Sequence, residues 1–231
     1  MVDPETVPRR IEGRGVTASF TPALGHAALS GFYDPVITML TRERVWRARL
    51  LDQVAPQPGE TVIDLGCGTG SFAVSLAQRA PGARIVGVDP DNDILRRAAA
   101  KAAAAGQNIL FVEAFARDVA AVLGDRAADK IVSSLVFHQL PMEEKRRGLA
   151  ASLRALKPGG TLHIADYGRQ TGSMRMLFRI VQSLDGYENT QPNADGVLPD
   201  LIVEAGFTDV REVDVLPTLT GAIAFYRAVR P

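Results

Sequence analysis

Short apolar runs alternate with longer helical patterns along most of this chain of 231 residues. The apolar runs are rich in β-branched residues, which is typical of strands. They are Thr61–Leu65, Arg84–Val88, Ile109–Val112, Lys130–Ser134 and Thr161–Ala165. Helical spacing or strong helix formers fill the segments between them, Gly70–Arg79, Asn92–Ala105, Ala116–Leu123 and Met142–Leu156. This alternation predicts an α/β fold with a parallel sheet that is covered by helices on both faces.

The C-terminal part departs from this alternation. Leu198–Ala205 has the pattern of a helix that ends at Gly206. Thr208–Val215 and Ala222–Val229 follow as two strands that are close enough in sequence to pair antiparallel. We therefore expect the chain to end in a strand pair that joins the same sheet.

The long segment Gly168–Pro199 lies before this strand pair and is interrupted by several glycines and prolines. Within it, apolar residues from Met174 to Leu184 recur at helical spacing, and Arg175 and Arg179 lie beside them. We expect this helix either to help enclose an apolar or aromatic ligand or only to cover the sheet. The two arginines are available for an acidic ligand, although a solvated helix face is the more common reason for such charges.

A helical pattern also precedes the sheet, from Leu24 to Val54, with an interruption near Pro35. Pro56-Gln57-Pro58-Gly59 ends it and marks the boundary to the core. The first fifteen residues have no such pattern. We expect three segments, which are a flexible tail over 1–15, an N-terminal helical cap over 16–57 and one α/β domain over 58–231.

Composition and charge exclude several classes of protein. Hydrophobic residues make up 46% and charged residues 23%, which is typical of a globular chain. Lys+Arg and Asp+Glu both number 26, so a polyanion such as nucleic acid is not expected as the main partner. The sequence has neither an apolar run long enough to span a bilayer nor the apolar core of a secretory signal, so we expect a cytoplasmic protein. Cys67 is the single cysteine, and no metal site is expected.

The sharpest chemical signal is a glycine-rich turn between the first strand and the first helix. It consists of Asp64-Leu65-Gly66-Cys67-Gly68-Thr69-Gly70. Glycines at these positions let the backbone turn tightly and approach a ligand without a clash from a Cβ atom. The helix that follows offers its N-terminal amides to a polar group. Cys67 is expected to fill the tight turn with a small side chain, although a thiol at a helix N-terminus can also be reactive.

A second acid, Asp89, ends the next strand about twenty residues later. A carboxylate there accepts hydrogen bonds from both hydroxyls of a ribose. Dinucleotide-binding turns have the spacing G-x-G-x-x-G, but here Ser71 stands where the third glycine is required. The carboxylate of Asp64 also suits an ammonium group and repels a pyrophosphate. The spacing thus argues against a nicotinamide oxidoreductase and for another cofactor that contains adenosine.

Together, Asp64–Gly70, Asp89 and Leu156-Lys157-Pro158-Gly159-Gly160 resemble the motifs of class I S-adenosylmethionine-dependent methyltransferases. The resemblance is to the ubiquinone/menaquinone-biosynthesis-like branch that acts on small molecules, and it spans roughly Tyr33 to the C-terminus. It implies a seven-stranded, Rossmann-like sheet with the order 3-2-1-4-5-7-6 and an antiparallel strand 7. It also implies S-adenosylmethionine as cofactor and a small-molecule methyl acceptor. A homodimer is compatible with the sequence.

The same resemblance assigns cofactor contacts outside the turn. Pro90 is expected to pack on the adenine, and the backbone amide of Ala116 is expected to meet that ring. Phe115 stands where the family usually has an acid, so it either packs beside the adenine or belongs to the core. Tyr33 is expected near the carboxylate of the cofactor. Ser134 opens the segment after the fourth strand, which in the family covers the methionine arm.

His138 and Tyr167 are the candidates for catalysis. A sulfonium methyl is already activated, so a protein mainly has to align it with the acceptor and exclude water. His138 matches the first histidine of a pair in the family and is a candidate base, since neutral imidazole accepts a proton near neutral pH. It is equally compatible with a structural histidine at a strand end. Asp166 and Tyr167 follow the fifth strand, where they either orient an acceptor or cap the next segment.

The sequence therefore predicts methyl transfer to a small molecule, with an aromatic or quinone-like ring as the candidate acceptor. Phe115 and the sequence His138-Gln139 depart from the family pattern. A methyltransferase-like protein that has lost most of its activity and binds the cofactor or a partner is the alternative.

Overall fold

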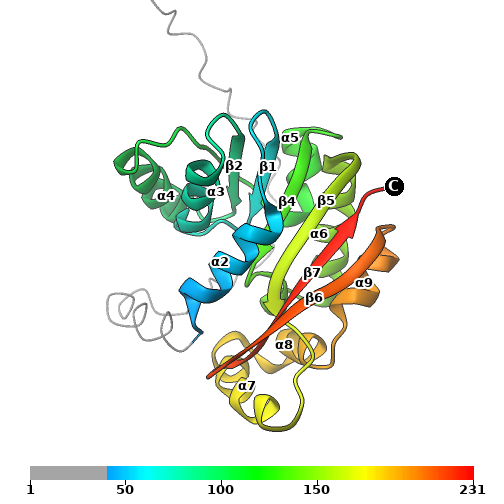
Figure 1. The fold of residues 1–231 in the computed structure, drawn as a ribbon. Coiled ribbons are helices and arrows are strands. Elements are labelled where there is room, and N and C mark those ends of the chain that lie inside the picture. The colour runs from blue at the N-terminus through cyan, green and yellow to red at the C-terminus, as the bar shows by residue number, and fades with distance from the viewer. Residues whose placement is uncertain (1–40) are drawn as a thin grey trace, which may run out of the picture.

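One seven-stranded sheet forms the centre of the molecule (Figure 1). The computed structural model describes residues 41–231. The sheet order is β3-β2-β1-β4-β5-β7-β6. The strands are β1 Thr61–Leu65, β2 Arg84–Asp89, β3 Leu110–Glu113, β4 Ala128–Ser134, β5 Leu156–Tyr167, β6 Thr208–Thr218 and β7 Gly221–Val229. The first five strands are parallel, and β7 runs antiparallel to both neighbours. The predicted fold class and strand order are confirmed.

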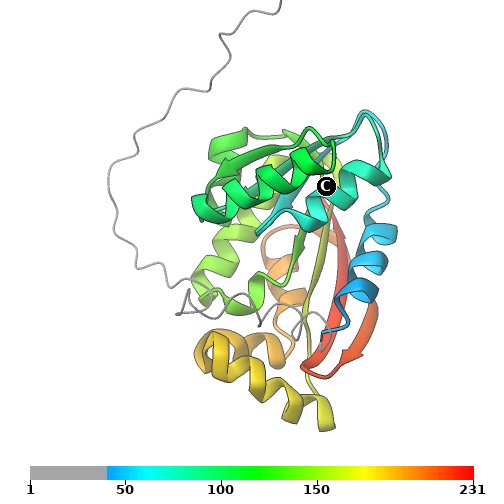
Figure 2. The ribbon, with the colours of Figure 1, turned by 90° about the vertical axis from the view of Figure 1, so that its left-hand side faces the viewer.

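Helices cover both faces of this sheet. The α-helices are α2 Glu43–Val54, α3 Ser71–Arg79, α4 Asn92–Ala104, α5 Val119–Leu123, α6 Met142–Ala155, α7 Gly172–Asp185, α8 Tyr187–Ala194 and α9 Leu198–Glu204. Two short 3₁₀ helices, η1 Ala116–Asp118 and η2 Phe137–Gln139, follow β3 and β4. Figure 2 shows α2, in blue, and the green α6 on opposite sides of the sheet.

Two apolar clusters hold these layers together. On one face, α2 contributes Trp46, Leu50 and Val54 to a cluster that includes α3, α7 and the sheet. On the other face, α5, α6 and α9 pack on a cluster that includes Ile63, Leu149 and Ile202. Burial of apolar side chains at about 25 cal/mol per Å² is the main favourable term for such a core. The sheet is therefore sandwiched in the way that the strand pattern predicts.

Several boundaries differ from the prediction. β5 begins at Leu156, because Leu156 pairs with Ala128 of β4 before the register shifts toward Lys130. The Lys-Pro-Gly-Gly segment thus lies inside a long strand. The segment after β5 forms two helices, and Pro192 lies inside the second, α8. Burial of Thr190, Asn193 and Ala194 offsets the hydrogen bond that a proline cannot donate.

Part of the predicted N-terminal organisation lies outside the described residues. The tail over 1–15 and most of the cap over 16–57 belong to residues 1–40, and so does Tyr33. Helix α2 is the described part of the cap, and it packs into the same core as β1 and α3. The predicted boundaries at 15/16 and 57/58 stay predictions. Within residues 41–231, no helix is long and apolar enough to cross a membrane.

Parallel strands bring several predicted residues to one edge of the sheet. Asp89 follows the register pair Leu65–Val88, and Ser133 of β4 lies opposite Leu65. Ser134 pairs with Ala165, which places the end of β4 beside the end of β5. Ligands of open α/β sheets bind beyond this edge. Helices α7 and α8 lie at the same end of the molecule, below β5 in Figure 1.

Candidate functional site

The glycine turn connects β1 to α3 through three residues with positive φ angles. These angles are 74° at Gly66, 52° at Gly68 and 74° at Gly70. A Cβ atom at Gly66 would lie 2.3 Å from Val136 Cγ2, and one at Gly70 would lie 2.9 Å from Ala98 Cβ. A Cβ atom at Gly68 would meet nothing within 4 Å among the described residues. Two glycines thus permit close packing, whereas Gly68 borders open space that a ligand can approach.

Asp89 is bound to this turn. Its Oδ2 accepts a hydrogen bond from the Gly68 amide at 3.0 Å, and its Oδ1 accepts one from the Asp91 amide at 3.0 Å. Burial raises the pKa of the Asp89 carboxyl more than these two amides lower it. The structure therefore brings together the glycine turn and the second acid, as the proposed ribose contact requires.

Asp64 is a buried carboxylate without a hydrogen-bond partner among the described residues. Its exposed fraction is 1%, and neither carboxylate oxygen accepts a hydrogen bond. Burial raises its pKa to about 7, although the Arg47 guanidinium lowers it, and the charge of Asp89 raises it further. The Ala73 amide also lowers this pKa, but its geometry does not meet that of a hydrogen bond. A buried carboxylate is costly unless it is paired. An unpaired acid beside a glycine turn fits a cationic part of a ligand, as the ammonium group of methionine is.

Cys67 fills the turn between Gly66 and Gly68. It is buried, and its Sγ lies 3.7 Å from the carbonyl oxygen of Gly68. Burial, together with the charges of Asp64 and Asp89, raises the pKa of its thiol far above the usual range. The thiolate is the reactive form of cysteine. These surroundings favour the interpretation of Cys67 as a small filler of the turn.

The predicted adenine contacts lie near Asp89. Pro90 follows it and is half-buried, and the Ala114 amide donates to the Asp89 carbonyl at 3.2 Å. The Arg117 guanidinium lies 4.3 Å from the centre of the Phe115 ring. Ala116 begins η1 directly after Phe115. Phe115 replaces the acid of the family and makes a cation–π contact with Arg117. A contact between Phe115 and the adenine stays a prediction.

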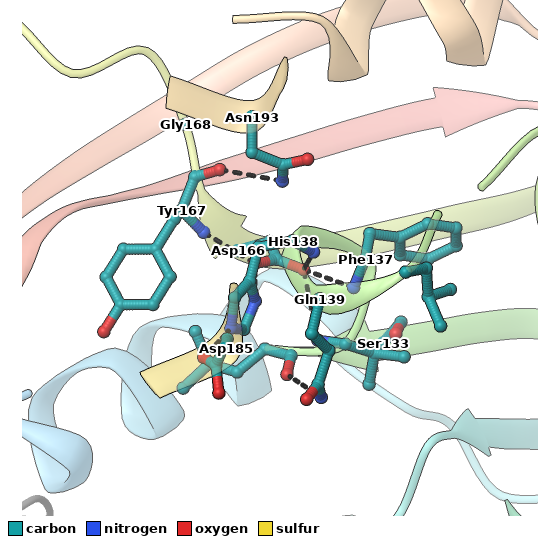
Figure 3. Close-up of polar contacts among 12 residues, drawn as sticks. Ser133, Phe137, His138, Gln139, Asp166, Tyr167, Gly168, Asp185 and Asn193 are labelled. Carbon is teal, nitrogen blue, oxygen red and sulfur yellow. Dashed lines mark hydrogen bonds and ion pairs between the residues drawn. The ribbon is translucent and has the colours of Figure 1, made fainter. Parts of the chain in front are cut away.

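A network of charged groups, in which His138 and Asp166 are buried and Asp185 is half-buried, lies at the ends of β4 and β5 (Figure 3). His138 Nδ1 is 2.7 Å from Asp166 Oδ1, and His138 Nε2 is 3.1 Å from Asp185 Oδ2. Asp166 Oδ2 also accepts from the amides of Val136, Phe137 and His138 at 3.1, 2.7 and 3.3 Å. His138 thus joins β5 to the end of α7.

The protonation of His138 follows from these partners. Burial by itself lowers the pKa of the imidazole, but Asp166 and Asp185 outweigh burial and raise the pKa to about 9. Imidazolium donates through both ring nitrogens, which matches one carboxylate at each nitrogen. At neutral pH such a histidine carries its proton and cannot accept another. This geometry supports a role in holding the site together more than a role as base.

Tyr167 and Ser134 lie at the same sheet edge. The Tyr167 hydroxyl is 2.8 Å from Thr220 Oγ1, and its ring meets that of His138 edge-on at 5.0 Å. Burial raises the pKa of the Tyr167 hydroxyl well above its usual value. Ser134 is half-buried at the end of β4. The two predicted catalytic residues are thus neighbours, but both are buried and already paired.

Two residues of this network were not found from the sequence. Lys145 of α6 is fully buried, and Asp185 ends α7. The signal for Lys145 was its position, because it shares a helix face with the buried residues Leu149 and Ser152 at spacings of four and seven. Asp185 ends α7, where the helix dipole disfavours an acid, and nothing in the sequence indicates that its partner is His138.

A hollow of about 360 Å³ opens between α7 and α8. Its lining consists of Gly172, Arg175, Met176, Arg179, Gln182, Tyr187 and Gln191. Arg175 pairs with Asp195 at 2.7 Å, whereas Arg179 has no hydrogen-bond or ion-pair partner among residues 41–231. This volume is within the range of small-molecule sites. No group of three or more potential metal ligands occurs in the described part of the chain.

The fold and this geometry define a Rossmann-like domain that binds a cofactor containing adenosine. Residues 62–160 match the family model of a methyltransferase domain. The chain is 33% identical over 224 residues to a demethylmenaquinone methyltransferase of Clavibacter sepedonicus. The matched part covers 88% of this chain and 87% of that protein. A demethylmenaquinone methyltransferase of Thermus thermophilus is 33% identical over 136 residues, which cover 58% of this chain and 60% of the relative.

A solved structure shares the fold. Phosphoethanolamine N-methyltransferase 2 of Haemonchus contortus, in complex with S-adenosyl-L-methionine, has a TM-score of 0.63 at 18% identity. The likeness covers 81% of this chain and 52% of that one. The chain belongs to the class I S-adenosylmethionine-dependent methyltransferases, and S-adenosylmethionine is its cofactor.

Proposed function

We propose that this methyltransferase moves the methyl group to a small aromatic or quinone-like molecule by in-line displacement. The observation that carries the proposal is the buried, unpaired carboxylate of Asp64 beside Gly68 and Asp89. The acceptor class is supported by two relatives that are demethylmenaquinone methyltransferases. We assign the hollow between α7 and α8 to the acceptor, where Met176 and Tyr187 are the large apolar side chains in a lining that is otherwise polar.

The cofactor contacts are assigned to this chain's residues as follows. Asp89 would accept from the ribose hydroxyls, and Asp64 would face the ammonium group of the methionine part. Gly66, Cys67, Gly68 and Gly70 would bring the backbone close to that part. The remaining contacts would come from Tyr33, Pro90, Phe115, Ala116 and Ser134. Bound S-adenosylmethionine supplies a methyl group on a positively charged sulfur, which needs no further activation.

The protein's part in the reaction is alignment and exclusion of water. We propose that His138, as imidazolium between Asp166 and Asp185, positions the segment after β4. Tyr167 would help to hold His138 in place through its contacts with His138 and Thr220. To act as a general base, His138 would first have to lose the proton that Asp166 and Asp185 stabilise on its ring. The positioning role needs no such change.

Binding of S-adenosylhomocysteine tests the cofactor site. Calorimetry should give a Kd in the micromolar range for the wild type, and Asp89→Ala should raise it on the order of 100-fold, because hydrogen bonds to a charged group contribute about 1.5–3 kcal/mol. The matched control is Asp93→Asn on the surface of α4, which should leave the Kd unchanged. Equal affinities for the wild type and Asp89→Ala would contradict the assigned ribose contact.

Product analysis tests the reaction. Incubation with S-adenosylmethionine and a panel of demethylated quinols, phenols, thiols and amines should give a methylated ring compound by mass spectrometry. Tight cofactor binding without any product would favour the alternative, a methyltransferase-like protein with little or no activity. Phe115 and Gln139, which depart from the family pattern, are the observations that favour this alternative.

A second acceptor class is favoured by Arg179, the cation in the hollow that has no described partner. If the acceptor carries a carboxylate, Arg179→Gln should raise its KM about 10- to 100-fold through loss of a charge-assisted hydrogen bond. Kinetics with an acid and with its methyl ester measure this, since only the acid should respond. Arg96→Gln, a surface control on α4, should change neither KM. An equal response of acid and ester would argue for a purely apolar site.

The assembly and location stay predictions. A homodimer is a proposal that light scattering of the purified chain tests directly. The expected cytoplasmic location and the absence of nucleic acid as a partner are likewise proposals, the latter supported by the balance of 26 basic and 26 acidic residues.

A further inference from the structure

The ammonium group of Lys145 lies inside the protein, and its hydrogen-bond partners among residues 41–231 are all backbone carbonyls. Its Nζ is 2.6 Å from the Phe137 oxygen, 3.3 Å from the His138 oxygen and 2.6 Å from the Leu140 oxygen. A fourth carbonyl, that of Asn189 in α8, lies at 2.9 Å. Three ammonium protons are thus shared among four acceptors. The proposed methyl transfer, as described above, makes no use of this lysine.

Lys145 and Asp166 hold opposite sides of one segment, residues 136–140, here called the 136–140 loop. Asp166 accepts from the amides of Val136, Phe137 and His138, whereas Lys145 donates to carbonyls within the same loop. Asp166 also interacts electrostatically with the lysine and favours its charged form. Two buried groups of opposite charge therefore fix both the donors and the acceptors of this backbone.

The loop touches the cofactor turn at its first residue. A Cβ atom at Gly66 would lie only 2.3 Å from Val136 Cγ2, so the absence of a side chain at Gly66 lets the loop pack this closely. The preceding residue, Leu135, has a left-handed backbone with φ 55°. Such a conformation costs about 1–2 kcal/mol for a residue other than glycine, and it persists only when its surroundings impose it. Asp166 and Lys145, here together called the clamp, impose such a constraint through their hydrogen bonds to the 136–140 loop.

At its other end, the clamp reaches the segment assigned to the acceptor. The Asn189 carbonyl belongs to α8, which lines the hollow through Gln191. His138 of the same loop contacts Asp185 at the end of α7. A displacement of the loop at Gly66 would thus change the partners of both helices.

A lysine is an expensive choice for a purely structural position. Burial lowers its pKa to about 8, so the charged form is disfavoured relative to a lysine in water. Methionine would fill a similar volume, but it would leave four carbonyls without the donor they now share. The position therefore requires the ammonium group and not only its volume.

We propose that Lys145 is a positioning residue which fixes the 136–140 loop against the glycine turn and couples the cofactor site to α8. The inference rests on the proposed function, since it takes the glycine turn as the cofactor site and α7–α8 as the acceptor site.

The first test is the binding of S-adenosylhomocysteine to Lys145→Met, measured by calorimetry. The affinity should fall about tenfold, a typical size for coupling between sites. Lys157→Met removes an exposed lysine that pairs with Asp129, and it should bind like the wild type. Wild-type affinity in folded Lys145→Met would overturn the inference and leave the proposed function intact. Absence of binding in the wild type would instead overturn the proposed function.

The second test begins with the wild type, so its first part does not depend on the folding of a variant. Saturation with S-adenosylhomocysteine should slow amide hydrogen exchange in the 136–140 loop and also in α8, measured by mass spectrometry of peptides. If the lysine carries the coupling, this protection of α8 should be lost in folded Lys145→Met, whereas a merely structural lysine predicts the same protection in that variant, because α8 also packs directly on η2. Unchanged exchange in α8, with protection of the turn present, would overturn the coupling.

Discussion

Replacement of Asp64 by asparagine is expected to weaken cofactor binding on the order of 100-fold. The carboxylate is buried and unpaired among the described residues, so its charge is available to an ammonium group of the cofactor. Loss of a charge-assisted contact costs about 2–3 kcal/mol, which corresponds to that change in Kd. Calorimetry with S-adenosylhomocysteine measures it, and an unchanged Kd would remove Asp64 from the site.

The same variant should be more stable than the wild type in the absence of cofactor. The folded pKa of about 7 lies above the ordinary value of 3.8, so unfolding at neutral pH releases a proton. This group therefore lowers stability progressively as pH rises from about 4 to 7, and its effect is complete above pH 7. Three pKa units correspond to about 4 kcal/mol, of which we expect about 2 kcal/mol in the variant because the buried amide is also unpaired.

Urea denaturation at pH 4 and pH 8 separates this effect from others. The stabilisation in Asp64→Asn should be present at pH 8 and nearly absent at pH 4. Asp93→Asn, at an exposed acid of α4, serves as the control and should be neutral within about 0.5 kcal/mol at either pH. Lower stability of Asp64→Asn at pH 8 would mean that the carboxylate has a partner that the described residues do not provide.

Replacement of Asp166 by asparagine is expected to lower the free energy of unfolding by about 3–4 kcal/mol. Asp166 accepts from four backbone amides and from His138, and an amide group cannot accept through its nitrogen. Breaking a buried pair leaves the other charge uncompensated, at a cost of that order. Asp125→Asn, which breaks an exposed pair with Arg154, should cost less than about 1 kcal/mol.

His138 should report the same change through its titration. Its folded pKa of about 9 exceeds the ordinary 6.5, so its contribution to stability is complete below pH 6.5 and is lost as pH rises through 9. In Asp166→Asn the pKa should fall by at least one unit, because burial is then opposed mainly by Asp185. Proton NMR of the imidazole across pH 5–10 measures this value. A wild-type pKa near 6.5 would contradict the described network.

The arrangement of the candidate cofactor site was largely predictable because it depends on local geometry. Glycines at 66, 68 and 70 are needed where the chain turns with positive φ, and they lie at alternate positions of one short stretch of sequence. Asp89 was predictable as well, since parallel strands of regular length bring β1 and β2 to a common edge. The structure added that Asp89 accepts from the Gly68 amide, a contact between residues 21 positions apart.

The α7–α8 region was predicted less well. Glycines and prolines in this segment indicated an irregular connection, but the structure has a second helix that contains Pro192. The reason is packing, since Asn193 of α8 is buried and donates to the Tyr167 carbonyl at 3.1 Å. The free energy that these tertiary contacts contribute exceeds the free-energy cost of a proline inside the helix.

By itself, the sequence determined the α/β architecture, the strand order through its family motifs, and the glycine turn with its two acids. These features repeat with the period of a strand or helix, or lie within one turn of the chain. Only the tertiary structure decided the state of His138 and the existence of the buried network. Asp166, Lys145 and Asp185 come from three different elements, and the burial of Asp166 and Lys145 sets which charges are stabilised. The charge on a buried side chain depends on its neighbours in space, which no local pattern of residues specifies.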